Sequence, residues 1–366
     1  MHLIIDAHED LAYNALSFGR DYRRSAYETR RQEAGGETPA RTGDTMLGWS
    51  EYQLGQVAVV FGTLFLAPAR YASGAWETQV FRDAETGRRG CRAQVAYYQR
   101  LAGDSPDCFR LIRTKGDLAS VLQPWQERPA DPPAVTHPVG IVMLMEGAEG
   151  LGCPQELEEF VEAGLRIVGP VWAGTRFCGG MYEPGGFTSE GYELLEVMAS
   201  LGLTLDIAHM NEESALEALD RYEGPVIASH ANAAALLNGS RSQKRHLSDL
   251  ALRRLVERDG VVGVMPLNHF LVPGWAKGDP KDRVHLDALV AHIDHICQLA
   301  GDARHVGMGS DFDGGFGWQH TPAELDTIAD LQRLEPLLKE RGYSNEDITA
   351  ILGKNWQQHL EKTLPE

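Results

Sequence analysis

Eight short runs of apolar and β-branched residues recur along the chain. They show little alternation between apolar and polar positions, which is typical of strands covered on both faces in a parallel sheet. The first run, "LII", leads directly into the acidic and histidine-containing segment "DAHED". The runs cover residues 3–5, 57–66, 139–145, 165–171, 203–208, 225–229, 261–265 and 305–309.

Amphipathic helical patterns lie between most of these runs. One spans residues 189–202, with Ser189 as a plausible N-cap and Gly202 as a plausible stop. Others span residues 211–222, 248–260 and 286–301. Eight strands alternating with helices predict one domain over residues 1–366, a closed (β/α)8 TIM barrel of the α/β class. An open doubly wound sheet is the alternative, but no GxGxxG motif follows the first strand.

Two stretches fall outside this repeat. Residues 19–47 form a polar insertion after the first strand, and residues 123–138 form a Pro-rich loop. We expect both to be excursions from the barrel and not linkers between domains.

Histidines and acidic residues follow five of the eight predicted strands. Because the active site of such a barrel lies at the carboxyl ends of its strands, we expect these side chains to meet. Each has an ordinary structural interpretation: a lone histidine can be a hydrogen-bonded structural residue, and "DFDGG" can be a turn. Together they predict a site for one or two divalent metals, with zinc favoured by the mixed nitrogen and oxygen donors. The residues are His8, Asp10, Glu146, His209, His230, Asp311 and Asp313, while Pro68, Trp172 and Pro266 follow the other strands.

The acidic residues can be assigned provisional roles. Residues two apart on an extended segment point the same way, so His8 and Asp10 can hold one ion, with Asp6 behind them and Glu9 facing solvent. No lysine follows a predicted strand, which favours Glu146 over a modified lysine as a bridge between two metals. Two metals would hold a shared hydroxide for attack on an amide or ester, and Asp311 could transfer its proton to the leaving group.

Composition narrows the class of protein. The chain is 43% hydrophobic and 23% charged, as in ordinary globular proteins, and no apolar run is long enough for a membrane span. No secretory signal is visible, and five cysteines without CxxC spacing predict free thiols in a reducing, cytoplasmic setting. The formal charge of −18 argues against nucleic-acid binding.

Six segments, in order, resemble motifs of the membrane (renal) dipeptidase family of zinc peptidases. They are "IDAHEDLAYNAL", "MEGAEG", "GFTSEGYELLEVMASLGLTLDIAHM", "PVIASHANA", "HIDHICQLAGDARHVGMGSDFDGG" and "ILGKNWQQHL". The resemblance implies a homodimeric dipeptidase with two zinc ions, acting on dipeptides that include those with C-terminal D-residues. It implies that His8 and Asp10 hold the first zinc, His209 and His230 the second, that Glu146 bridges them, and that Asp311 is the acid/base.

Substrate-binding residues are predicted at three positions, Arg245, Trp172 and Tyr13. The family binds the substrate carboxylate with an arginine; in "RSQKRHLSD" Arg245 is the better match and Arg241 the second choice, unless either arginine only pairs with a surface acid such as Asp249. Trp172 stands where the family often has a histidine that stabilises the oxyanion. An indole carries no positive charge, so Trp172 is interpreted as a pocket wall.

Trp172 also motivates an alternative function. The chain could be a related binuclear amidohydrolase acting on another amide or ester, such as an N-acyl amino acid. A third hypothesis, a catalytically inactive barrel that binds a small ligand, is disfavoured by the complete set of metal-ligand residues.

Overall fold

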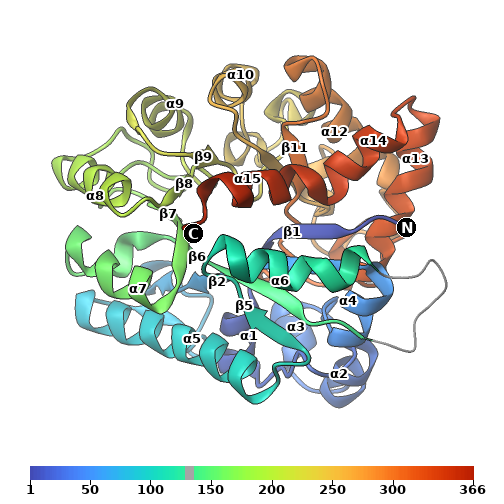
Figure 1. The fold of residues 1–366 in the computed structure, drawn as a ribbon, viewed down its shortest axis with the longest axis horizontal. Coiled ribbons are helices and arrows are strands. Elements are labelled where there is room, and N and C mark those ends of the chain that lie inside the picture. The colour runs from blue at the N-terminus through green and yellow to red at the C-terminus, as the bar shows by residue number, and fades with distance from the viewer. Residues whose placement is uncertain (128–135) are drawn as a thin grey trace.

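The computed structural model describes residues 1–127 and 136–366, and it forms a parallel barrel (Figure 1). The strands are hydrogen-bonded in the order β10-β11-β1-β2-β6-β7-β8-β9, and a parallel bridge between Ala228 and Val262 joins β9 to β10. Each of the eight predicted runs overlaps one of these strands, which confirms the TIM barrel. The strands are β1 Ile4–Glu9, β2 Val57–Phe65, β6 Val139–Glu146, β7 Leu165–Gly169, β8 Thr204–Asp206, β9 Val226–Ile227, β10 Val262–Val264 and β11 Val306–Met308.

Helices lie around the outside of the strands (Figure 1). Their buried faces are apolar; in α10, for example, Leu252 and Leu255 are buried while Leu250 is exposed. The helices are α1 Leu11–Phe18, α4 Trp49–Gly55, α5 Ala84–Asp104, α6 Lys115–Gln126, α7 Leu157–Ala163, α8 Ser189–Ser200, α9 Glu212–Arg221, α10 Asp249–Glu257, α11 Asn268–Leu271, α12 Leu286–Ala300, α13 Leu334–Glu340, α14 Asn345–Thr349 and α15 Asn355–Thr363.

The predicted cap of α8 is wrong by one residue. Thr188 is the N-cap, and its side chain accepts a hydrogen bond from the backbone N–H of Gly191, whereas Ser189 is the first helical residue. Both residues carry the hydroxyl that a cap needs, so the pattern could not separate them. Gly202 adopts a left-handed φ of 66° just after the helix, as expected of a stop.

The polar insertion contains two short helices, α2 (Ala26–Glu33) and α3 (Thr38–Thr42). Asp313 attaches it to the barrel: its buried carboxylate accepts hydrogen bonds from Tyr22 (3.0 Å), Thr45 (2.5 Å) and the N–H of Met46 (3.0 Å). Arg20 lies 3.0 Å from the same carboxylate. Asp313 therefore anchors the insertion. It was predicted to lie among the metal-ligand residues, and its carboxylate is engaged here instead.

Smaller elements complete the fold. Strands β3 (Ala67–Pro68) and β4 (Val80–Phe81) pair with each other, and β5 (Phe109–Leu111) pairs with β6. The predicted Pro-rich loop begins inside α6, which includes Pro124, so residues 123–126 are helical and not loop. Residues 128–135 of that loop lie outside the described residues.

All five cysteines are free, as predicted. Within the described residues, no helix combines the length and apolar character that crossing a membrane requires.

Candidate metal centre and active site

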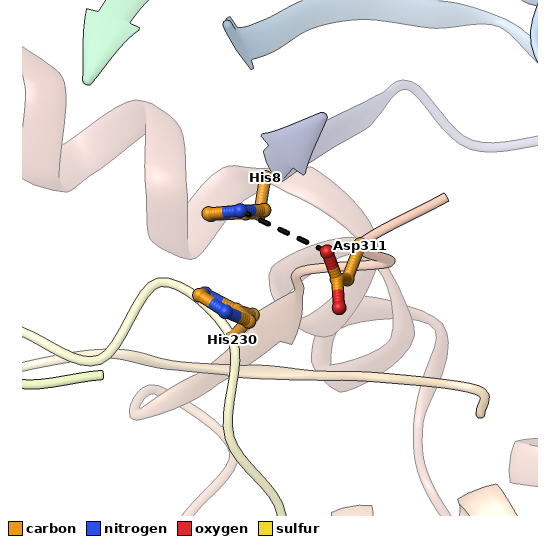
Figure 2. Close-up of side chains that lie close together, drawn as sticks. All are labelled: His8, His230 and Asp311. Atoms are coloured by element: carbon orange, nitrogen blue, oxygen red, sulfur yellow. Dashed lines mark ion pairs between the residues drawn. The ribbon is translucent and has the colours of Figure 1, made fainter. Parts of the chain in front are cut away.

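The predicted metal ligands meet at the carboxyl end of the barrel. His8 lies within β1 and Asp10 follows it, while Glu146 is the last residue of β6. His209, His230 and Asp311 each stand three residues after the last residue of β8, β9 and β11, respectively. Figure 2 shows the side chains of His8, His230 and Asp311 converging from three different elements.

Two groups of three potential ligands share Glu146. His8, Asp10 and Glu146 form one group, and Glu146, His209 and His230 form the other, with the donor atoms of each group within 4.8 Å of one another. Oε1 of Glu146 lies 2.8 Å from Nε2 of His209, and Oε2 lies 3.5 Å from Nε2 of His8. A carboxylate with one oxygen toward each group is suited to bridging two ions, and the bridging role of Glu146 stays a prediction. His8, His230 and Asp311 form a third, overlapping group.

The electrostatics of the cluster favour a bound cation. Burial lowers the pKa of His8, but the nearby carboxylates, with Glu146 foremost, outweigh it and raise that pKa to about 10. Burial and then Glu146 raise the pKa of Asp10 to about 7. Burial, with Asp10 and Glu146 adding to it, also raises the pKa of Asp311. Nε2 of His8 is buried and has no hydrogen-bond partner among the described residues. Crowded carboxylates and an unpaired imidazole nitrogen fit divalent metal ions.

Two members of the cluster have an unusual backbone. His209 and Asp311 have left-handed φ angles of 67° and 56°. Residues other than glycine rarely adopt this conformation, and such strain gathers at functional sites, where the surrounding structure holds it. Here it occurs three residues after the ends of β8 and β11, at two side chains that belong to the cluster.

A buried pair that the sequence analysis missed orients the histidines. The hydroxyl of Ser229 donates to Asp206 (2.5 Å) and lies 2.8 Å from Nδ1 of His230 and 3.4 Å from Nδ1 of His8. Because that hydroxyl already donates its proton to Asp206, it accepts from Nδ1 of His230, which leaves Nε2 free to bind metal. The sequence did contain a signal for this pair, because Asp206 stands near the end of a predicted strand and Ser229 directly precedes His230.

The backbone of Ser229 packs closely against two glycines of neighbouring strand segments, Gly263 and Gly309. A Cβ on Gly263 or on Gly309 would lie 1.9 Å from the carbonyl oxygen of Ser229. No other residue fits either position without moving the segment that carries His230.

The two other acids of the first strand are both buried. Asp6 accepts a hydrogen bond from the N–H of Ser310 (2.6 Å), and so supports the segment that precedes Asp311. Glu9 was predicted to face solvent, and this is wrong: it is 0% exposed and accepts a hydrogen bond from Tyr52 (2.5 Å). Both faces of a barrel strand are covered, so alternation along β1 turns Glu9 toward the surrounding helices and not toward water.

A cavity of about 300 Å³ opens over the cluster. Of the described residues that line it, Asp10, Glu146, His209 and Asp311 belong to the cluster. Such a volume is at the lower end for small-molecule sites. All three predicted substrate-binding residues, Arg245, Trp172 and Tyr13, line it as well.

Arg245 is a buried donor inside this cavity. Its Nη2 lies 3.0 Å from Nε2 of His209 and donates to the carbonyl oxygen of His230 (3.2 Å). Its Nη1 is buried without a hydrogen-bond partner among the described residues. Arg241 is exposed and does not line the cavity, so the structure separates the two candidates.

Trp172 belongs to a continuous row of aromatic rings along one side of the cavity. Its ring lies 5.3 Å from Phe65 and 5.2 Å from Tyr182, and 6.0 Å from the ring of His209. Tyr13 continues the row, 5.6 Å from Phe65. This arrangement is that of an apolar wall.

Glu149, another residue missed by the sequence analysis, holds this wall in place. Its buried carboxylate accepts hydrogen bonds from the backbone N–H groups of Trp172 (3.0 Å), Ala173 (3.2 Å) and Gly174 (3.0 Å). Glu149 lies three residues after Glu146 in "MEGAEG", and nothing in the sequence there distinguishes a buried structural carboxylate from an exposed loop carboxylate.

Buried imidazoles and carboxylates at the carboxyl ends of a parallel barrel define a metal-dependent hydrolase of the (β/α)8 class. A match to the family model described as membrane dipeptidase (peptidase family M19) covers residues 1–363. The chain belongs to this family and is a peptide-bond hydrolase.

Individual curated proteins are similar to this chain over parts of its length. A protein of the pqqA 5′ region of Klebsiella pneumoniae is 34% identical over 278 residues, which are 73% of this chain and 94% of that protein. A Schizosaccharomyces pombe protein named as an uncharacterized dipeptidase is 31% identical over 58% of this chain, and the match spans only about half of that relative, 51%.

Solved structures show the same fold. A metallopeptidase called dipeptidase AC superposes with a TM-score of 0.78 at 23% identity, covering 100% of this chain and 99% of that one. A metallopeptidase from Rhodobacter sphaeroides, liganded with a phosphinate mimic of the dipeptide L-Ala-D-Ala, has a TM-score of 0.76 at 24% identity, covering 99% of both chains.

Proposed function

We propose that this chain is a zinc dipeptidase that hydrolyses the single peptide bond of dipeptides, including those with a C-terminal D-residue. The observation that carries the proposal is the pair of ligand groups that share Glu146, beneath a cavity lined also by Arg245, whose buried Nη1 has no hydrogen-bond partner among the described residues. The phosphinate mimic of L-Ala-D-Ala bound to the Rhodobacter sphaeroides metallopeptidase supports the extension to D-residues.

His8 and Asp10 would hold one zinc ion, His209 and His230 the other, and Glu146 would bridge them. Zinc ions held by these residues would supply Lewis-acid chemistry, which activates water near neutral pH and polarises the scissile carbonyl.

Asp311 is suited to move the proton. Its carboxylate oxygen lies 3.8 Å from Nε2 of His8, at the edge of the cluster, and it lines the substrate cavity (Figure 2). Burial raises its pKa, and a carboxyl group with a raised pKa can accept a proton and then donate it to a leaving amine.

Arg245 would anchor the free carboxylate of the substrate. A guanidinium matches a carboxylate through two parallel hydrogen bonds, and the buried Nη1 has no competing partner among the described residues. Trp172, packed among Phe65 and Tyr182, would contact the substrate as a wall and leave oxyanion stabilisation to the metal.

Purified, zinc-loaded protein assayed against a broad panel of dipeptides tests the proposal, with metal content measured on the same sample. We expect hydrolysis of free dipeptides, D-configured C-terminal residues included, and about two zinc ions per chain if both groups are filled. A metal-loaded protein that leaves the whole panel intact contradicts the proposal.

The second candidate is an amidohydrolase that acts on N-acyl amino acids or related amides, and Trp172 in place of a histidine is the observation that favours it. An N-acyl amino acid keeps the free carboxylate of a dipeptide but lacks the free amino group, so the two candidates are separated by comparing free dipeptides with N-acyl amino acids. A dipeptidase hydrolyses the free dipeptides preferentially, whereas preferred hydrolysis of N-acyl amino acids supports the alternative.

The remaining sequence predictions belong to the same proposal: residues 1–366 act as one catalytic domain, in the cytoplasm, and as a homodimer in keeping with the family resemblance. Light scattering of the purified protein tests the assembly.

A further inference from the structure

One cavity-lining carboxylate has no role in the site described so far. Glu77 lies on the segment between β3 and β4 and is only 9% exposed, yet it lines the cavity over the metal ligands. The hydroxyl of Tyr13 donates to its Oε1 (2.7 Å), and the backbone N–H of Ser73 donates to its Oε2 (2.6 Å). These two bonds hold the carboxylate in one orientation.

Both of these partners are neutral, and the described residues contain no ion pair that involves Glu77. Arg41 lines the same cavity, but it pairs with Glu37, and its guanidinium lies 5.2 Å from the centre of the Trp76 ring. A largely buried carboxylate without a nearby positive charge is costly. Each of its oxygens still has an acceptor position after one hydrogen bond, so a cation that enters the cavity can bind there.

Glu77 and Arg245 are attached to different sides of the metal-ligand cluster. Arg245 contacts His209, a member of one ligand group. Glu77 is joined through Tyr13 to α1, the helix that begins directly after Asp10, a member of the other group. The cavity thus offers a buried positive group beside one ligand group and a buried negative group connected to the other.

We propose that Glu77 binds the free α-ammonium group of the N-terminal residue of the substrate. This inference rests on the dipeptidase function proposed above. A free dipeptide carries one positive and one negative end, and Glu77 and Arg245 would each take one of them. Glu77 would then make the enzyme select substrates that have an unblocked amino terminus.

The test compares free dipeptides with their N-acetylated counterparts, using zinc-loaded wild type and Glu77→Gln. The glutamine removes the charge and keeps one acceptor oxygen, which can serve either the hydroxyl of Tyr13 or the N–H of Ser73. We expect wild type to prefer the free dipeptide at least tenfold in kcat/KM, and Glu77→Gln to lose most of that preference through a higher KM, with kcat little changed. Glu77→Asp, which keeps the charge, should retain part of the preference.

Glu85→Gln is the matched control, because Glu85 is exposed on α5 and does not line the cavity. This substitution removes one carboxylate charge near Glu77 in the sequence, and it should leave the preference for free dipeptides unchanged. Thermal unfolding of all variants reports whether the fold is intact. Dipeptides with an N-terminal lysine, free and acetylated only at the α-amino group, separate the α-ammonium from a side-chain ammonium as the bound cation.

A binding measurement keeps this inference separate from the proposed function. Calorimetry with a phosphinate dipeptide mimic, in its free-amine and N-acetyl forms, does not need turnover. Weaker binding of the free-amine form to Glu77→Gln, with the N-acetyl form unaffected, supports the role even if no dipeptide is hydrolysed. Equal binding of both forms by wild type, or an unchanged preference in Glu77→Gln, overturns it while leaving dipeptide hydrolysis intact.

Discussion

The floor and the wall of the cavity are built in opposite ways. The floor consists of Asp10, Glu146, His209 and Asp311, with His8 and His230 buried beneath them, all carried at or just beyond the ends of barrel strands. The wall consists of aromatic rings that pack on one another: Phe65 ends β2 and Trp172 stands three residues after β7, while Tyr182 lies on the long segment between β7 and α8. We therefore expect the polar floor to determine which reaction is possible and the aromatic wall to determine which substrate fits.

This contrast predicts two kinds of defect. A change in the floor should lower kcat or metal content for every substrate, because it alters groups common to all reactions at the site. A change in the wall should act on KM and on the choice of substrate.

The largest effect is expected from Glu146→Gln. An amide cannot offer two anionic oxygens to two ions, and a buried carboxylate that contacts three histidines is lost. We expect kcat/KM to fall by about a thousandfold or more, together with the measured zinc content. Full activity with two bound metals would show that the bridge lies elsewhere.

Asp311→Asn should reduce kcat by about 10² to 10⁴ while the metal stays bound, because asparagine cannot carry the proton. Metal analysis alongside steady-state kinetics checks this prediction. Because Asp311 also belongs to a ligand group with His8 and His230, loss of metal in the variant would instead assign Asp311 to metal binding.

The floor could be predicted from the sequence almost completely. A barrel brings every strand end to one rim, so the order of His8, Glu146, His209, His230 and Asp311 along the chain is enough to place them together. The errors within this region have a local cause. Glu9 was predicted to face solvent because it points away from His8 and Asp10. On a barrel strand, however, the outer face is covered by helices, so a side chain on that face is buried.

Ser229→Ala tests how far the floor depends on groups that do not contact the metal. The hydroxyl of Ser229 lies near the Nδ1 atoms of His230 and His8, one histidine from each proposed metal site. Its removal leaves those nitrogens without this acceptor, and we expect metal affinity to fall by about 10- to 100-fold. Titration of the metal-free protein with zinc measures the change. Ser214→Ala, at a buried serine that bonds Gly179 and Gly185 instead, is a matched control.

The wall could be predicted much less well. Trp172 was found because it follows a strand, but its neighbour Tyr182 and the supporting Glu149 lie where no periodic pattern applies. Their positions depend on hydrogen bonds between segments far apart in the sequence, such as those from Glu149 to residues 172–174. The same holds for the polar insertion, whose attachment to Asp313 joins residues more than 260 positions apart.

The smallest effect, and the sharpest test of the contrast, is expected at Trp172. If the indole is only a wall, Trp172→Phe keeps an aromatic ring and should change kcat and KM by no more than about twofold, whereas Trp172→Ala should raise KM several-fold for substrates with bulky apolar side chains. If the indole N–H instead stabilises the oxyanion, Phe and Ala lack it equally, and both should lower kcat by a similar factor. Steady-state kinetics of the two variants on one bulky and one small dipeptide distinguishes these outcomes. A similar loss of kcat in Trp172→Phe and Trp172→Ala would show that the indole N–H of Trp172 takes part in catalysis and that its ring is not only a wall of the cavity.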